Sequence, residues 1–182
     1  MRFKYLILTL ALAMPVVAGP ITLVPSASGL NVGDPLTLTI QATSLTDLYA
    51  YQFSLTFNPA VLSAVTTAAG TFLPSAASLF MPAQIDNTAG TLTFLSETLI
   101  GGVPGISGNG PLATVSFVAL APGTSAIEFS NVLLLNSSLG EVTSNWNNTS
   151  VSVTDVPEPS VLVLLLAGFT CLATGRLMFG KR

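Results

Sequence analysis

The chain has 182 residues, of which 50% are hydrophobic and only 7% are charged, and its formal net charge is −3 at pH 7. All eight carboxylates lie between Lys4 and Arg176, that interval holds no Lys or Arg, and the chain has no His. Nucleic acid is therefore excluded as a partner, because affinity for phosphate groups comes from Lys and Arg. A Ser-His-Asp catalytic triad is excluded as well, and a single cysteine, Cys171, excludes an internal disulfide.

The first 18 residues have the organisation of a secretory signal peptide. Arg2 and Lys4 form a positive start, residues 5–14 are apolar, and small residues lead up to Ala18. Signal peptidase cleaves after such a segment, so we expect cleavage between Ala18 and Gly19. Residues 19–155 would then form the exported working domain, a length that suits one hydrophobic core.

Apolar and polar residues alternate through much of this domain, which is typical of half-buried β-strands. The clearest segment is 49–57, where odd-numbered positions are aromatic or Leu and even-numbered positions are small or polar. The same alternation marks five shorter segments: 36–41, 91–94, 114–117, 127–129 and 151–153. Within 91–94 it places Leu92 and Phe94 on the same, core-facing side. Turn-forming residues separate the segments and no long amphipathic helix is present, so we predict an all-β, antiparallel sandwich.

Two stretches depart from the alternation. Residues 60–69 follow Asn58-Pro59, and their apolar residues have a spacing that fits either a short helical turn or a tight strand. Residues 101–110 are rich in glycine and contain one proline, a composition that predicts an exposed, mobile loop.

Three motifs follow one another in the domain. Val32-Gly33-Asp34 comes first, then the aromatic-rich strand in 47–62 that ends in Asn58-Pro59 and a Val-Leu pair, then 112–117 with Ala121-Pro122-Gly123 behind it. Their order resembles the cohesin family over residues 21–153. The resemblance implies a jelly-roll sandwich related to carbohydrate-binding modules. It also implies protein-protein adhesion, with a dockerin-like partner bound through one sheet face.

Trp146 and its neighbours suggest an alternative function. An aromatic ring can stack on a sugar while flanking amides, here Asn145 and Asn147, bond the sugar hydroxyls. Carbohydrate binding, with extracellular polysaccharide as the ligand, therefore stays open beside adhesion. The competing interpretation is a Trp at a sheet edge or over the core near the last strand.

We predict no catalytic residue, metal ligand or cofactor. Asp86 and Glu97 are the only pair considered for glycoside cleavage, which is the most distant alternative, and we expect both to be solvated surface carboxylates. The acids are scattered, and no Asp-x-Asp-x-Asp loop for a cation is present.

The C-terminal segment, 156–182, begins with Pro157-Glu158-Pro159. An almost uncharged stretch, 160–179, follows with Arg176 as its only charge, and the chain ends in Lys181-Arg182. This length permits one transmembrane helix with a cytoplasmic basic end. The segment resembles the PEP-CTERM sorting signal, although residues 177–179 split its basic cluster. The resemblance implies that an exosortase recognises Pro157, Glu158, Pro159 and Arg176.

Together these features predict a non-enzymatic protein in three parts: signal peptide 1–18, cohesin-like domain 19–155 and sorting signal 156–182. We expect a membrane-anchored precursor that signal peptidase and exosortase process. The product would then lie at the cell surface or outside the cell.

Overall fold

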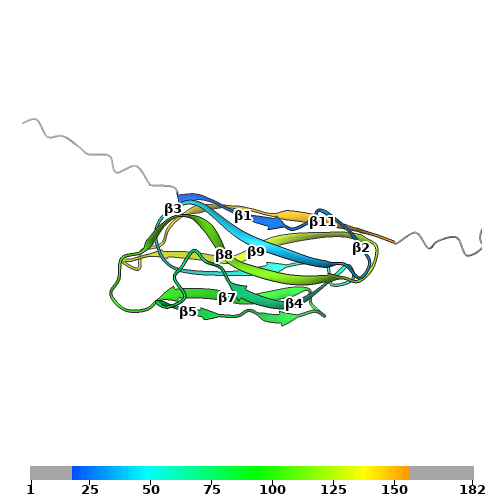
Figure 1. The fold of residues 1–182 in the computed structure, drawn as a ribbon, viewed down its shortest axis with the longest axis horizontal. Coiled ribbons are helices and arrows are strands. Elements are labelled where there is room, and N and C mark those ends of the chain that lie inside the picture. The colour runs from blue at the N-terminus through cyan, green and yellow to red at the C-terminus, as the bar shows by residue number, and fades with distance from the viewer. Residues whose placement is uncertain (1–17, 156–182) are drawn as a thin grey trace, which may run out of the picture.

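The computed structural model describes residues 18–155, which form eleven β-strands and no helix (Figure 1). The all-β prediction is confirmed. The predicted signal peptide and the residues Pro157, Glu158, Pro159 and Arg176 lie outside the described range. Within that range, no helix is long and apolar enough to cross a membrane. The strands are β1 Ala18–Pro25, β2 Gly29–Asn31, β3 Pro35–Thr56, β4 Leu62–Ala69, β5 Ser78–Met81, β6 Gln84–Asp86, β7 Thr91–Leu99, β8 Ile106–Ala119, β9 Gly123–Asn136, β10 Ser144–Asn147 and β11 Thr149–Thr154.

Strand β3 organises the sandwich because it belongs to both of its layers. Its first half pairs with β1 on one side and β8 on the other, and its second half pairs with β7 and β9. One layer is therefore β4–β8–β3–β1–β10, and the other is β9–β3–β7 with β5 and β6 at its edge. The strand bends between its halves, where Ser44 and Asp47 have positive φ angles of 51° and 53°.

The last strands close the structure. The first part of β9 pairs with β11, and β11 pairs in parallel with β2. Strand β10 pairs in parallel with β1. The described chain starts and ends at opposite ends of the long axis (Figure 1). The buried hydrophobic residues of this range form one core cluster, so we expect residues 19–155 to fold on their own.

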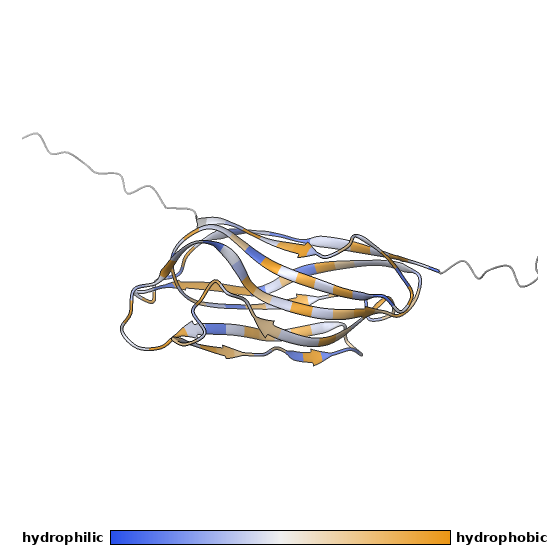
Figure 2. Cartoon of the chain, in the orientation of Figure 1, coloured by the Kyte–Doolittle hydropathy of each residue, from blue (hydrophilic) through white to orange (hydrophobic). Residues whose placement is uncertain are grey.

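Alternating side chains build that core as predicted. Bands of hydrophobic and hydrophilic residues succeed one another along the strands in Figure 2. Phe53 is fully buried at the centre, with its ring 5.8 Å from that of Tyr51 and 5.6 Å from that of Phe129, measured between centroids. Aromatic pairs in such offset and edge-on arrangements add about 0.5–1.5 kcal/mol each to the effect of burial.

Residues 60–69 fit the strand alternative, since Leu62–Ala69 forms β4 at the edge of its layer. Asn87 blocks the free side of this edge strand. Its Nδ2 donates to the carbonyl of Ala64 at 3.0 Å, and its Oδ1 accepts from the Ala64 amide at 2.8 Å. The Asn87 side chain thus occupies the backbone groups that another strand would need.

The loop prediction for 101–110 is wrong in its second half. Strand β8 begins at Ile106, and the register pairs Ile106 with Leu48, Gly108 with Leu45 and Gly110 with Ala42. The bent middle of β3 supplies a partner for this glycine-rich backbone, which composition alone does not reveal.

Candidate functional site

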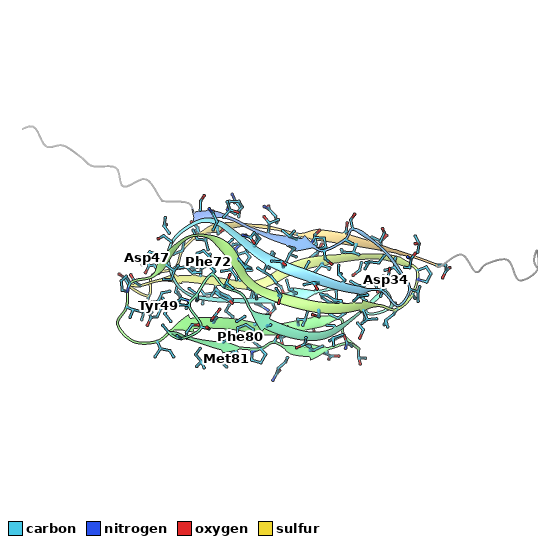
Figure 3. The ribbon with its side chains drawn as sticks, in the orientation of Figure 1. Asp34, Asp47, Tyr49, Phe72, Phe80 and Met81 are labelled. Carbon is cyan, nitrogen blue, oxygen red and sulfur yellow. The ribbon has the colours of Figure 1, made fainter. Side chains whose placement is uncertain are left out.

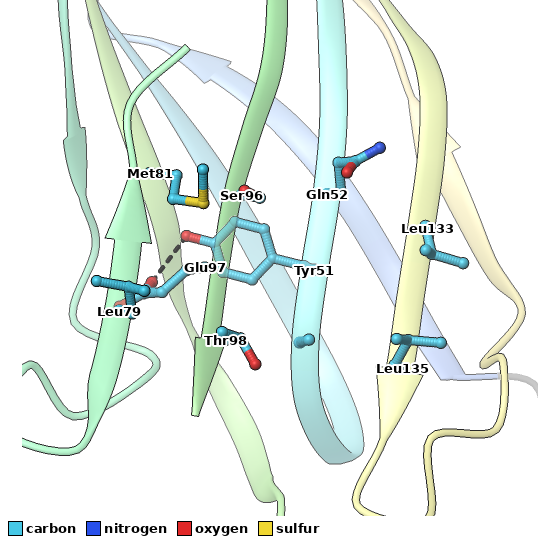
Figure 4. Close-up of a pocket in the computed structure, with 10 residues that line it drawn as sticks. Tyr51, Gln52, Leu79, Met81, Ser96, Glu97, Thr98, Leu133 and Leu135 are labelled. Atoms are coloured by element: carbon cyan, nitrogen blue, oxygen red, sulfur yellow. Dashed lines mark hydrogen bonds between the residues drawn. The ribbon is translucent and has the colours of Figure 1, made fainter. Parts of the chain in front are cut away.

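A shallow, uncharged trough runs along the outer surface of β5, β7, the second half of β3 and β9. The hollow in its middle measures about 160 Å³. Figure 4 shows the two leucines of β9 on one flank, Leu79 and Met81 of β5 on the other, and the central strands between them. We call these outward side chains the outer face: Leu79, Met81, Ala50, Gln52, Ser96, Thr98, Leu133 and Leu135.

Strand alternation explains why these residues point outward. On β3, Ala50 and Gln52 alternate with the buried Tyr51 and Phe53, and on β9 the two leucines flank the buried Leu134. Small and polar residues on the two central strands form the floor, while large apolar residues on the outer strands form the walls. The depth of the trough therefore follows from the difference in side-chain size between the central and the outer strands.

The wall on β5 is strongly exposed for such apolar residues, whereas Leu133 and Leu135 on β9 are half-buried. Leu79 is 55% exposed and Met81 is 57% exposed. Exposed apolar patches can serve as interaction surfaces, which makes this face the candidate site. Three steps between neighbouring strands separate β5 from β9, a width of about 14 Å. A single α-helix, about 10–12 Å across with its side chains, fits that width.

Tyr51, Glu97 and Ser78 form a polar network directly beneath the outer face. The Tyr51 Oη lies 2.8 Å from Glu97 Oε2 and 2.6 Å from the Leu112 carbonyl oxygen, and Ser78 Oγ donates to Glu97 Oε1 at 2.6 Å. Burial, and secondly the neighbouring Glu97 carboxyl, raises the pKa of Tyr51 far above its ordinary value. The network ties β5, which carries Leu79 and Met81, to the central strands.

The hydroxyl of Tyr51 has one proton and two acceptor neighbours. Its single proton is shared between Glu97 Oε2 and the Leu112 carbonyl oxygen, which both lie within hydrogen-bond distance of Tyr51 Oη. Ser78 satisfies the remaining oxygen of Glu97. This arrangement leaves no buried polar atom without a partner among the described residues.

The prediction of two solvated surface carboxylates is wrong for Glu97, which is only 2% exposed. Alternation along β7 directs it inward between Leu95 and Leu99. Asp86 is exposed on β6 and pairs with Thr91, six residues from Glu97 on β7. Six residues of strand span about 20 Å, so these two carboxylates do not form a pair across one site.

Asp47 fixes the loops at one end of the sandwich. Its Oδ1 accepts from the Gly105 amide at 3.0 Å, and its Oδ2 accepts from Ser137 Oγ at 2.8 Å. The hydrogen bond from Ser137 is the main cause that lowers the pKa of Asp47. Nearby, Tyr49 Oη donates to the Gly101 carbonyl at 2.6 Å. Figure 3 places Asp47 and Tyr49 at the end opposite Asp34.

The structure places Trp146 on β10, partly buried against the core. Its ring centroid lies 4.8 Å from that of Phe129 and 6.2 Å from that of Phe53. Asn145 and Asn147 alternate with it along the strand and are exposed, and Asn147 Nδ2 donates to Thr22 Oγ1 at 3.2 Å. The structure thus favours the interpretation of a Trp over the core, and the sugar contact stays a prediction.

The residues predicted for signal cleavage lie at the start of β1. Ala18 is the first described residue, and the Gly19 carbonyl accepts from Ser144 Oγ at 2.7 Å. Gly19 is packed tightly, because a Cβ there would collide with the Thr43 carbonyl. A chain cleaved before Gly19 would keep this contact, and the cleavage position itself stays a prediction.

Sequence reasoning missed the walls of the outer face. Strand β5 was not predicted, although the short run Ser78-Leu79-Phe80-Met81 alternates in the manner of a strand. Among the described residues, no group of three or more His, Cys, Asp or Glu could share a metal ion. The geometry described here is suited to holding a partner surface.

Comparisons with known proteins agree on the fold. The family model of the cohesin domain matches residues 22–153. A type II cohesin domain from the cellulosome of Acetivibrio cellulolyticus is 22% identical, with a TM-score of 0.63 over 74% of this chain and 94% of that one. A type II Cohesin-X-Dockerin complex from the same organism includes a chain that is 18% identical, with a TM-score of 0.64 over 74% of this chain and 99% of that one.

A non-cellulosomal cohesin from the archaeon Archaeoglobus fulgidus is 15% identical, with a TM-score of 0.60 over 74% of this chain and 91% of that one. At these identities the likeness to solved structures shows the fold. The comparison with curated proteins gave no match. The family match spans well over half of the sequence, and the chain therefore belongs to the cohesin domain family.

Proposed function

We propose that this protein is an exported, non-catalytic adhesion module whose outer face binds a dockerin-like protein. The observation that carries the proposal is a helix-wide, uncharged trough with exposed apolar walls on a cohesin fold. Such a surface loses little on desolvation because it buries no charge. Solved cohesins of this fold are described in complexes with dockerins from Acetivibrio cellulolyticus and Clostridium thermocellum.

Binding can be tested with residues 19–155 and a panel of dockerin modules that includes those two. Leu79→Asp places a charge on the outer face at a position that is 55% exposed, and Val65→Asp does the same on β4 in the other layer at 58% exposed. We expect a dockerin from the panel to bind the wild type and the Val65 variant, and Leu79→Asp to weaken binding at least tenfold. Absence of binding across the panel, or equal binding by both variants, would contradict the proposal.

The delivery part of the proposal is supported by the order of residues at both ends of the chain. Signal peptidase would act near Ala18, and an exosortase would act at Pro157-Glu158-Pro159 after the C-terminal segment has held the precursor in the membrane. Replacement of Glu158 by Ala should leave an unprocessed precursor in the membrane fraction. Normal processing of that variant, or of the wild type in cells without an exosortase, would overturn this part.

Carbohydrate binding has one observation in its favour. Trp146 lines a hollow of about 200 Å³ together with Glu141 and Thr143, whose polar groups could bond a sugar there. Thr143→Ala and Glu141→Gln change polar groups of the hollow and leave the contact of Trp146 with Phe129 in place. A loss of retention on immobilised polysaccharide in these two variants would implicate the hollow itself. Unchanged retention in both would reject it as a sugar site.

A further inference from the structure

Phe94 stands at one end of the outer face in a conformation that its residue type disfavours. Two residues of β7, Thr93 and Phe94, lie opposite the single residue Ser54 of β3, because the register passes from Leu95 directly to Leu92. This β-bulge gives Phe94 a φ of 58° and leaves its side chain 58% exposed. The prediction that Phe94 faces the core beside Leu92 is therefore wrong.

The β-bulge is held in place by a hydrogen bond and is not a frayed part of the strand. The Phe94 amide donates to Ser54 Oγ at 3.2 Å, and Ser54 itself is buried. A second register shift lies at the same level on the other side of β3, where Asn131 of β9 has a φ of 48°. Asparagine tolerates this left-handed conformation, but a bulky residue such as Phe is a clear outlier in it.

The Phe94 conformation brings little stability to the fold. Its backbone lies in a strained region, and its ring, which would contribute most when buried, faces solvent for more than half of its surface. Strain that persists without a packing benefit indicates a role in function. Exposed aromatic side chains are the usual energetic anchors of protein interfaces.

A change of surface character occurs on either side of Phe94. Along β3, the floor residues Ala50 and Gln52 come first. Ser54, which lies opposite Phe94 of β7, comes next, and Thr56 follows it. The register pairs Thr56 with Thr91 and Glu128, and Thr91 with Asp86. Paired residues share a face of the sheet, so two exposed carboxylates flank Thr56 and Thr91 just beyond Phe94.

Charge then restricts the chemistry of the partner. The described residues contain seven carboxylates and no Lys, Arg or His. The six steps from Ala50 to Thr56 span about 20 Å of strand, which corresponds to about thirteen residues of α-helix. A complementary helix is apolar over the trough and basic at the end that lies over Glu128 and Asp86.

We propose that Phe94 is the anchoring and specificity-determining residue of the outer face, an inference that rests on the proposed function. The partner presents an apolar helix with Lys or Arg in its terminal turn. Phe94 packs against that helix where its apolar stripe ends. The carboxylates beyond Phe94 attract the basic end of the partner and repel an acidic one.

The test uses residues 19–155 and two helical peptides of sixteen residues with one apolar stripe, which differ only in two Lys or two Glu in the last turn. Phe94→Asn keeps the bulge because Asn tolerates the left-handed conformation, and Val65→Asn is a control of equal exposure, 58%, in the other layer. Binding is followed by titration with amide NMR shifts, and stability by thermal unfolding.

We expect the Lys peptide to bind at least tenfold more tightly than the Glu peptide and to shift amides of β3, β5, β7 and β9. Phe94→Asn should weaken that binding at least tenfold without lowering the melting temperature, whereas Val65→Asn should change it less than twofold. Glu128→Gln should reduce the discrimination between the peptides.

Equal binding of the Lys peptide by wild type and Phe94→Asn would overturn the role of Phe94, and equal binding of both peptides would overturn the charge of the partner. A melting temperature lowered by several degrees in Phe94→Asn would make Phe94 structural. If neither peptide binds while a dockerin is still captured and lost on Leu79→Asp, this inference fails and the proposed function stands.

Discussion

The two halves of β3 differ although one strand forms both. In the first half, residues 35–40 pair with β8 and residues 38–42 pair with β1 without a shift of register, over a continuous row of buried aliphatic residues. The second half is flanked by bulges on both sides, covers a buried polar network and carries exposed apolar residues on its outer strands. The first half is a regular, buried part of the core, and the second half has the irregular register on which the proposed binding surface lies.

The sharpest way to break this comparison is to truncate one leucine in the first half of β3 and one leucine of the outer face, which is built around the second half. Leu38 is fully buried in the first half, and Leu38→Ala should lower the free energy of unfolding by about 2–5 kcal/mol through lost burial and a residual cavity. Leu79→Ala, on the outer face, should change it by less than about 0.5 kcal/mol. Chemical denaturation measures both, and similar losses would refute the division of roles.

The buried network beneath the outer face should respond in a manner that depends on the partner removed. Tyr51→Phe leaves Glu97 and the Leu112 carbonyl without their donor and should cost about 1–3 kcal/mol. Glu97→Gln should cost less, because the amide oxygen of Gln can still accept a hydrogen bond from Tyr51 or Ser78. A larger loss for Glu97→Gln than for Tyr51→Phe would contradict the role of Tyr51 as the main donor of this network.

Alkaline pH should weaken the second half selectively. Because the pKa of Tyr51 is raised in the folded state above its ordinary value of 10.0, its contribution is complete below pH 10 and is lost as the pH rises further. Stability should then fall by up to about 1.4 kcal/mol per pH unit for this one proton. Tyr51→Phe should remove that slope, and a slope that persists in the variant would assign it to another group.

The smallest effect is expected at the bend between the halves. The pKa of Asp47 is lowered, first by the hydrogen bond from Ser137, so its contribution is present above the ordinary value of 3.8 and is lost as the pH falls through the lowered value. Asp47→Asn should flatten the acid limb of a stability-pH curve slightly. Faster amide exchange at Gly105 and Ser137 in the variant would locate the effect, and an unchanged acid limb would exclude Asp47 from it.

Much of the fold could be predicted because alternation reports burial directly. The segments 36–41 and 49–57 need little context, since their buried apolar positions lie two residues apart, and only Ser54 is buried out of this alternation. Phe94 could not be placed this way, because a bulge shifts the period by one residue and depends on the register of the partner strand. Glu97 was misplaced for a related reason: a carboxylate in an alternating strand reads as exposed until Tyr51 and Ser78, 46 and 19 residues away, are known to meet it.

The candidate site was harder to predict than the core. The outer face draws on β5, β7, β3 and β9, and its relief depends on which strands stand next to one another. Sequence order places β7 between β6 and β8, whereas the sheet places it between β5 and β3. The strand order of the sandwich therefore had to be known before the exposed apolar residues formed one surface.

The two hydrogen bonds between the Asn87 side chain and the Ala64 backbone of β4 matter where many copies of the protein lie close together. In the proposed setting many copies of this chain share one cell surface, so each meets its own kind at high local concentration. An open strand edge without charge, such as Leu62–Ala69 offers, invites strand-to-strand polymerisation. The Asn87 amide occupies the Ala64 backbone groups and so interrupts that edge at one position.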